Sequence, residues 1–172
     1  DFLVSHIPNY EVDVKNITID DCYMYGLLLG DGCMSSKYLN GYLSLHSENK
    51  KHIVDFAKRY FENKCIDYSV DAGDGKAVRV RWNKNIAMPF RHNDLYNSQK
   101  EKRISHKWLN LPLDKSKFIV KGLLDTDGCK QKEYVFDSTS RILIEGLRYI
   151  LLRMGILTSG YTRNRIGQTH QT

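Results

Sequence analysis

One short motif occurs twice in this chain. It reads Gly-Leu-Leu-Leu-Gly-Asp-Gly-Cys at residues 26–33 and Gly-Leu-Leu-Asp-Thr-Asp-Gly-Cys at residues 122–129. Each copy predicts an apolar helix that ends at a carboxylate and is followed by a glycine, which is expected to adopt a left-handed C-cap. Small residues recur four positions apart, at Gly26 and Gly30 and again at Gly122 and Thr126, so we expect the two helices to pack backbone against backbone.

The last aspartates of the two copies, Asp31 and Asp127, are candidate metal ligands. If the helices lie side by side and parallel, the two carboxylates emerge together at the C-terminal ends, where unpaired carbonyl groups and the helix dipoles favour a cation. Carboxylate and carbonyl oxygens are the ligands that Mg2+ accepts. A single Asp-Gly after a leucine-rich run more often marks only a capped helix and a turn. The repetition of the whole pattern favours the metal site.

Length and charge restrict the class of protein. The chain has 172 residues, enough for one domain or for two small fused halves. Its 26 Lys and Arg against 20 Asp and Glu give a formal charge of +6, which suits a polyanionic partner. The four cysteines form neither a C-x-x-C pair nor a zinc pattern. There is no apolar run of membrane-spanning length and no signal-peptide pattern, so we expect an intracellular protein of the cytoplasm or nucleus without a membrane partner.

Hydrophobic periodicity predicts the order helix, strand, strand, helix, strand, strand from the first motif onward. The first two strands are expected at residues 33–39 and 42–48, around a hairpin turn at Asn40-Gly41. The helix between Glu48 and Lys64 has an apolar face, and Lys50 lies outside it. Further predicted elements are strands at 66–70 and 77–82, a short helix within 86–101, a strand at 133–137, a helix at 140–154 and a strand at 157–163.

The same order begins again after the second motif, which indicates an internal duplication. The second helices of the two copies are aligned by pairing Ile53 with Ile144, Phe56 with Leu147, Tyr60 with Leu151 and Phe61 with Leu152. The second copy stops before a fourth strand and a closing helix. We expect that these elements either were removed or are supplied by another chain.

The two motifs, with the segment Lys102-Arg103-Ile104 that precedes the second, resemble those of the LAGLIDADG (dodecapeptide-type) homing endonucleases. The endonuclease domains carried inside inteins are the most similar, although Ser105 replaces the usual proline. The resemblance covers about residues 22–163. It implies an α+β fold of two pseudo-symmetric αββαββα halves, the second incomplete, whose antiparallel sheets form a DNA-binding saddle. The expected divisions are an N-terminal extension at 1–21, a first half at 22–113 and a second half at 114–172.

The resemblance also implies a chemistry. Asp31 and Asp127, helped by the carbonyls of Gly30 and Thr126, would hold Mg2+ or another divalent cation for hydrolysis of both DNA strands. Lys102 matches the basic residue that the family places near the active site, although it could equally be a solvated lysine in a basic run. A monomer is expected, either embedded in an intein host protein or excised from it. Splicing is not expected, because the chain begins with Asp1 and lacks a final His-Asn.

Alternation along the predicted strands separates a core face from a DNA-binding face. Arginine suits guanine and asparagine suits adenine, whereas lysines suit phosphates. Each of these residues taken singly could also belong to an ordinary solvated sheet face. The candidate DNA-binding residues are Lys37, Tyr42, Ser44, His46, Lys76, Arg79, Arg81, Asn83, Lys130, Lys132, Arg163 and Arg165.

The sequence therefore predicts a metal-dependent, site-specific double-strand DNA endonuclease. One alternative is a binding module with the same saddle that does not cleave, either a DNA-binding regulator or an intron maturase that grips RNA. Another is a structural α+β domain in which the motifs are accidental. Aspartate at the end of both motifs favours the enzyme, because a protein that only binds nucleic acid needs neither carboxylate.

Overall fold

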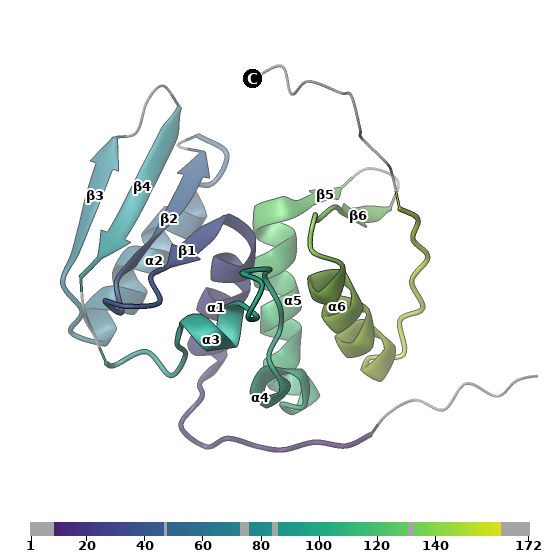
Figure 1. Ribbon diagram of the computed structural model, residues 1–172. Coiled ribbons are helices and arrows are strands. Elements are labelled where there is room, and N and C mark those ends of the chain that lie inside the picture. Colours follow the sequence, from purple (N-terminus) through teal and green to yellow (C-terminus); the bar gives the residue numbers. More distant parts are fainter. Residues whose placement is uncertain (1–8, 47, 73–75, 84–85, 131–132, 163–172) are drawn as a thin grey trace, which may run out of the picture.

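Two helices lie side by side at the centre of the protein, α1 (Ile19–Asp31) and α5 (Leu113–Asp127) (Figure 1). The computed structural model describes residues 9–46, 48–72, 76–83, 86–130 and 133–162. One antiparallel sheet flanks this helix pair on the α1 side and a smaller one on the α5 side (Figure 1). This arrangement confirms the predicted α+β class and the predicted packing of the two motif helices.

The larger sheet follows α1. Its strands are β1 (Gly32–Met34), β2 (Gly41–His46), β3 (Tyr68–Ala72) and β4 (Ala77–Trp82), in the order β1-β2-β4-β3. The amphipathic helix α2 (Lys51–Asn63) covers one face of this sheet, because its apolar side chains need a partner surface. Phe61 of α2 lies with its ring centroid 5.5 Å from that of Trp82, and Leu43, Leu45 and Val80 are buried on the same face.

The second motif helix begins a shorter copy of this arrangement. It contains β5 (Gly128–Lys130), β6 (Tyr134–Phe136) and α6 (Arg141–Arg153), with Ser140 as the N-cap of α6. The order helix, strand, strand, helix is thus repeated, as the sequence predicts. The helices α2 and α6 have the same length. Their buried residues coincide when Ile53 is paired with Leu143, Ala57 with Leu147 and Tyr60 with Ile150. The predicted pairing of Ile53 with Ile144 is wrong by one residue.

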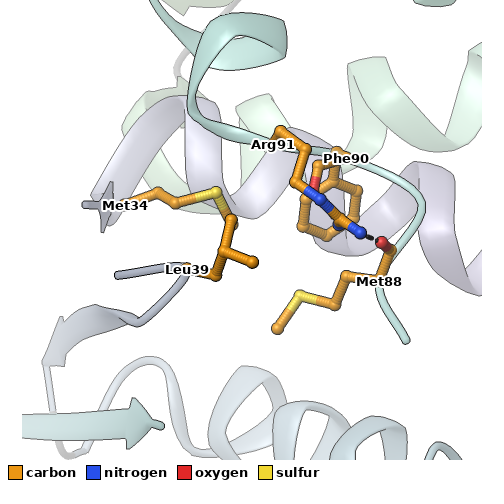
Figure 2. A pocket seen from close by; sticks show the side chains of 5 residues that line it. All are labelled: Met34, Leu39, Met88, Phe90 and Arg91. Atoms are coloured by element: carbon orange, nitrogen blue, oxygen red, sulfur yellow. Dashed lines mark hydrogen bonds between the residues drawn. The ribbon is translucent and has the colours of Figure 1, made fainter. Parts of the chain in front are cut away.

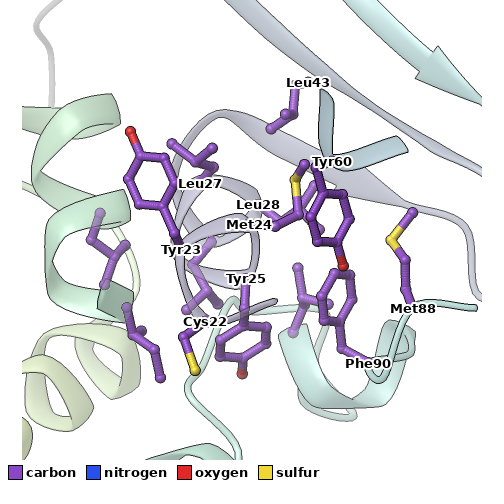
Figure 3. Packing of buried hydrophobic residues seen from close by; sticks show 14 of the residues in the cluster. Cys22, Tyr23, Met24, Tyr25, Leu27, Leu28, Leu43, Tyr60, Met88 and Phe90 are labelled. Atoms are coloured by element: carbon purple, nitrogen blue, oxygen red, sulfur yellow. The ribbon is translucent and has the colours of Figure 1, made fainter. Parts of the chain in front are cut away.

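The segment between the two copies anchors α1. It contains two short helices, α3 (His92–Leu95) and α4 (His106–Leu109), of which α3 was predicted. The ring of Tyr25 on α1 stacks on Trp108 of α4 with 4.1 Å between centroids. It also packs near Phe90 (Figure 3). The Tyr25 hydroxyl donates to the carbonyl of Asp94, so the buried ring keeps a polar partner.

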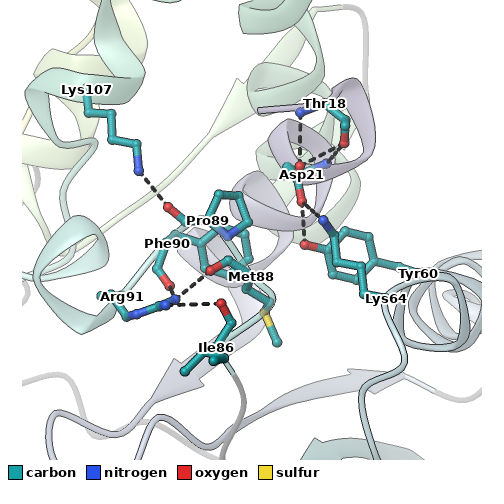
Figure 4. A network of polar contacts seen from close by, with 10 residues as sticks. All are labelled: Thr18, Asp21, Tyr60, Lys64, Ile86, Met88, Pro89, Phe90, Arg91 and Lys107. Atoms are coloured by element: carbon teal, nitrogen blue, oxygen red, sulfur yellow. Dashed lines mark hydrogen bonds and ion pairs between the residues drawn. The ribbon is translucent and has the colours of Figure 1, made fainter. Parts of the chain in front are cut away.

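A buried carboxylate fixes the beginning of α1. Asp21 accepts hydrogen bonds from Thr18 in a capping box, from Tyr60 at 2.7 Å, and from Lys64 at 2.9 Å (Figure 4). Burial acts to raise the pKa of Asp21, but the hydrogen bonds from Tyr60, Thr18 and Lys64 outweigh it and hold that pKa below its usual value. Since Tyr60 and Lys64 belong to α2 and its C-cap, this network joins α1 to α2.

Small residues determine how closely α1 and α5 approach. A side chain at Gly122 would place its Cβ 2.5 Å from the carbonyl oxygen of Tyr23, and one at Gly26 would meet the backbone of Ile119. The helices run in the same direction, because Gly26 lies against Gly122 and Gly30 lies against Thr126. A hydrogen bond of 2.6 Å from the Tyr23 hydroxyl to Asp125 crosses the seam.

The glycines that follow the two motif helices do not form left-handed caps. Gly32 has φ −98° and Gly128 has φ −78°, both extended, and each begins a strand. Glycine is needed at these positions for space, because a Cβ at Gly32 would lie 2.5 Å from the Cα of Leu28 and one at Gly128 would lie 2.7 Å from the Cα of Leu124. The predicted left-handed caps are therefore wrong.

The predicted hairpin turn at Asn40-Gly41 is also wrong. Gly41 is the first residue of β2 and pairs with both Met34 and Trp82, and the connection between the strands spans residues 35–40. The Trp82 ring lies over Gly41, where a side chain would clash. Glycine is thus needed here for the close approach of a ring rather than for a turn.

The predicted strand at 157–163 is not formed over its described part, residues 157–162. In the first copy, β3 pairs only with β4. The described part of the second copy has no strand equivalent to β4, so residues 157–162 have no neighbouring strand there, and the Thr158 carbonyl accepts a hydrogen bond from the Arg148 guanidinium instead. Leu157 is accordingly 82% exposed.

A small crevice lies beside the connection between β1 and β2. It is lined by Met34, Leu39, Met88, Phe90 and Arg91 (Figure 2). The Arg91 guanidinium donates to the carbonyls of Met88 at 2.5 Å and of Phe90 at 2.8 Å. Since its charged group is used within the chain and the rest of the lining is apolar, this crevice serves packing.

Replacing Gly122 by alanine tests the helix seam. The added Cβ meets backbone atoms of α1, so we expect Gly122→Ala to lower the free energy of unfolding by about 1–3 kcal/mol despite the better helix propensity of alanine. Chemical denaturation measures this loss. The matched control is Gly160→Ala, where a Cβ meets nothing within 4 Å and a change below about 0.5 kcal/mol is expected. Equal stabilities of the two variants would contradict the close packing of α1 and α5.

Candidate metal and nucleic-acid site

The C-terminal ends of α1 and α5 meet. A Cβ at Gly30 would lie 2.6 Å from the Cβ of Thr126 and 3.2 Å from a carboxylate oxygen of Asp127. Asp31, the next residue of α1, lies close enough that its charge raises the pKa of Asp127. The four residues predicted to form a metal site are therefore brought together, although their role as ligands stays a prediction.

Two lysine ammonium groups contact this cluster. The Lys50 ammonium lies 2.5 Å from a carboxylate oxygen of Asp31 and 2.6 Å from the carbonyl oxygen of Thr126. The Lys102 ammonium donates to the carbonyl of Gly30. Cations thus already contact three of the four predicted ligand residues, which fits a site built for positive charge.

Lys50 was missed by the sequence analysis, which placed it outside the apolar face of its helix. It is the N-cap residue of α2, but its side chain forms no cap and reaches the ends of α1 and α5 instead. Helical periodicity gives only the local face of a residue, so this long-range contact left no sequence signal.

The charges at the site act on one another. Burial is the main cause that raises the pKa of Asp127, and Asp31 adds to it, while Lys102 and Lys50 oppose the shift. Burial likewise lowers the pKa of Lys102, against the opposing effect of Asp127 and Asp31. Two carboxylates and two ammonium groups therefore share one partly desolvated site.

The donor set is of a particular kind. Within the described residues, no three His, Cys, Asp or Glu side chains gather as a metal site. The available oxygens are two carboxylates and the carbonyls of Gly30 and Thr126. Such a set is typical of Mg2+ sites that are completed by a phosphate substrate rather than enclosed by protein.

The sheet places several candidate DNA-binding residues on one face. Tyr42 pairs with Arg81, and Ser44 pairs with Arg79, so these four side chains share the face opposite α2. The Arg79 guanidinium lies 5.9 Å from the centre of the Tyr42 ring, and Arg81 forms an ion pair of 3.2 Å with Asp71 on β3. His46 ends β2 with the same alternation.

The other candidates are distributed around this face. Lys37 is exposed in the connection between β1 and β2 rather than on a strand, and Lys76 is exposed just before β4, 3.9 Å from Glu48. Asn83 lies just beyond the end of β4, not within it. Lys130 is the last residue of β5. Lys132, Arg163 and Arg165 lie outside the described residues.

Comparison with protein families gives one match. Residues 116–172 match the model of the LAGLIDADG-like domain, which includes the second motif. Over the described part of the chain, no helix is long and apolar enough to cross a membrane.

Two curated proteins of Methanocaldococcus jannaschii match nearly the whole chain. The ATP-dependent DNA helicase Hel308 is 29% identical over 91% of the chain, and glutamine–fructose-6-phosphate aminotransferase (isomerizing) is 26% identical over 90%. The chain spans only 13% and 14% of the lengths of these proteins.

Solved structures of the homing endonuclease I-DmoI have the same fold. Mesophilic variants of I-DmoI match with a TM-score of 0.67 and 16% identity, covering 89% of this chain and 86% of the other. I-DmoI in complex with DNA and Mn matches with a TM-score of 0.65 and 16% identity, covering 86% and 84%. The complex with DNA and Ca matches with 0.63 and 17%, covering 84% and 76%. The fold of this protein is that of the LAGLIDADG homing endonucleases.

The pKa of Asp127 tests whether the two carboxylates share a site. Asp31→Asn removes a neighbouring negative charge, so we expect the pKa of Asp127 to fall. Titration of the aspartate carboxyl carbons by NMR, without metal or DNA, measures it. Asp125→Asn is the matched control, because Asp125 lies on α5 together with Asp127 but is not among the groups that shift the pKa of Asp127. An unchanged pKa in Asp31→Asn would mean that the carboxylates do not interact.

Proposed function

We propose that this protein is a site-specific DNA endonuclease that hydrolyses both strands of a duplex with the help of divalent cations. The observation that carries the proposal is the meeting of Asp31 and Asp127, with the carbonyls of Gly30 and Thr126, at the paired ends of α1 and α5. The match to the LAGLIDADG-like domain and to the fold of I-DmoI, which has been solved with DNA and Mn, supports it.

The proposed ligands are the two carboxylates and the two carbonyls, and Mg2+ is the cation that suits these hard oxygens. A bound divalent cation would polarise the scissile phosphate and neutralise charge on the leaving oxygen. The Lys102 ammonium, held at the carbonyl of Gly30, would neutralise charge on a phosphate at the same place. Both aspartates belong to one chain, so we propose that a monomer acts.

The exposed face of the larger sheet would lie in the major groove. Arg79 and Arg81 would supply contacts to bases or phosphates. The Tyr42 ring would hold the Arg79 guanidinium in place by a cation–π contact. The ion pair with Asp71 on β3 would orient Arg81 on this face before DNA arrives. A DNA target implies that the protein works in the cytoplasm or nucleus.

We further propose that the chain is the endonuclease part of an intein. The supporting observation is that it matches 13% and 14% of two proteins, a helicase and an aminotransferase, whose names describe unrelated activities. A segment common to unrelated enzymes is expected of an inserted element and not of a domain that serves their chemistry.

Substitution of each aspartate tests the nuclease. A library of randomised duplexes incubated with protein and Mg2+, followed by sequencing of the cut ends, identifies the target. We expect Asp31→Asn and Asp127→Asn each to reduce cleavage of that target about 100-fold or more while binding is kept, because the lost carboxylate holds the cation and not the DNA. Asp125→Asn is the control that retains cleavage. A wild-type protein that retains duplexes of a defined sequence from the same library but yields no cut ends would favour the binding module instead.

Substitution of the arginines tests the DNA-binding face. We expect Arg79→Ala and Arg81→Ala each to weaken binding by about 1–2 kcal/mol and to reduce the slope of log K against log salt by about one. Fluorescence anisotropy at several salt concentrations measures both. Arg59→Ala removes the same charge from the exposed side of α2 and is expected to leave binding nearly unchanged. An equal loss in all three variants would indicate a general charge effect and no specific face.

A further inference from the structure

The position of Lys50 suggests a role that does not follow from its helix. Lys50 precedes the first turn of α2, where the positive end of the helix dipole disfavours an ammonium group. Its side chain leaves that end and joins the C-terminal ends of α1 and α5, where both dipoles are negative and a carboxylate is present. Lys50 thus bridges the two motif helices through Asp31 and the carbonyl of Thr126.

We propose that Lys50 is an internal counter-ion that competes with the divalent cation for Asp31 and the Thr126 carbonyl. The proposal rests on the proposed function in one respect, that these two groups are metal ligands. In the absence of DNA and metal, the ammonium neutralises the site and holds the helix ends together.

The ammonium and a metal ion cannot occupy the same position. The Lys50 nitrogen lies 2.5 Å and 2.6 Å from the two oxygens, whereas Mg2+ binds oxygen at about 2.1 Å. A cation bound by both oxygens would therefore overlap the ammonium and repel it. The Lys50 side chain must move away before the metal can bind, and the flexible lysine stem permits that movement.

The two lysines of the site differ in what their ammonium groups contact. The Lys50 ammonium contacts both the Asp31 carboxylate and the Thr126 carbonyl, whereas the Lys102 ammonium contacts the Gly30 carbonyl. The Lys50 side chain is 22% exposed and reaches the site from the end of a separate helix. Because Lys50 occupies two of the proposed ligand groups, it is the lysine that a metal ion at these groups would displace, and a DNA phosphate arriving at the site would offer its ammonium a new partner.

Calcium binding to the DNA-free protein tests the competition. Isothermal titration with Ca2+ alone compares the wild type with Lys50→Met, and we expect about tenfold or tighter binding by Lys50→Met because the competing charge is gone. Lys51→Met removes the same charge from the next, exposed residue and is expected to bind Ca2+ as the wild type does. Lys50→Arg keeps the cation and is expected to bind Ca2+ no more tightly than the wild type.

Thermal unfolding gives a second readout. Without metal, Lys50→Met is expected to unfold at a lower temperature, because two carboxylates lose a counter-ion, and Ca2+ is expected to raise its unfolding temperature more than that of the wild type. If Lys50→Met does not fold, Lys50→Gln removes the same charge and keeps a polar group.

Equal Ca2+ affinity of the wild type and Lys50→Met, or an equal gain in Lys51→Met, would overturn the proposal. This outcome is distinct from failure of the nuclease. If the wild type never cuts DNA, but Lys50→Met gains Ca2+ affinity and loses it again when Asp31→Asn is added, the counter-ion role stands and the nuclease does not. If the wild type cuts and Lys50→Met gains nothing, the reverse holds.

Discussion

The close approach of α1 and α5 is the contact on which the rest of the structure depends. Gly26, Gly30 and Gly122 have no side chain, so the two backbones touch along the helices and their C-terminal ends fall at the same level. Larger residues would separate the axes and with them Asp31 and Asp127. At the end of the seam, Gly32 and Gly128 follow the two helices and let the backbone continue directly into β1 and β5.

The two ends of α1 each carry an aspartate, and the partners of the two carboxylates differ in kind. At the beginning of α1, the buried Asp21 carboxylate accepts hydrogen bonds from Thr18, Tyr60 and Lys64. At its end, Asp31 accepts from a lysine that comes from another helix. One aspartate of this helix is therefore structural, and the other is the one that we propose exchanges its lysine for a metal ion.

Much of this arrangement can be predicted from the sequence, because it is carried by local patterns that recur. The small residues four positions apart predict the seam, and alternation along β2 and β4 predicts that Tyr42, Arg79 and Arg81 share a face. The failures concern glycines and strands whose state depends on distant partners. Gly41 is needed because the Trp82 ring lies against it, and residues 157–162 form no strand because the described part of the second copy offers no neighbouring strand. Lys50 could not be found, since nothing local indicates that the start of α2 faces the helix ends.

We propose that the ends of both motif helices jointly hold a divalent cation when DNA is present. Iron-mediated affinity cleavage measures this directly. Fe2+ is bound in place of Mg2+ in the presence of a duplex, ascorbate and peroxide then produce radicals at the metal, and mass spectrometry locates the breaks in the polypeptide. With a jointly held cation, we expect breaks near both Asp31 and Asp127, and loss of both sets in Asp127→Asn. Breaks near one helix end alone, or a set near Asp31 that persists in Asp127→Asn, would contradict it.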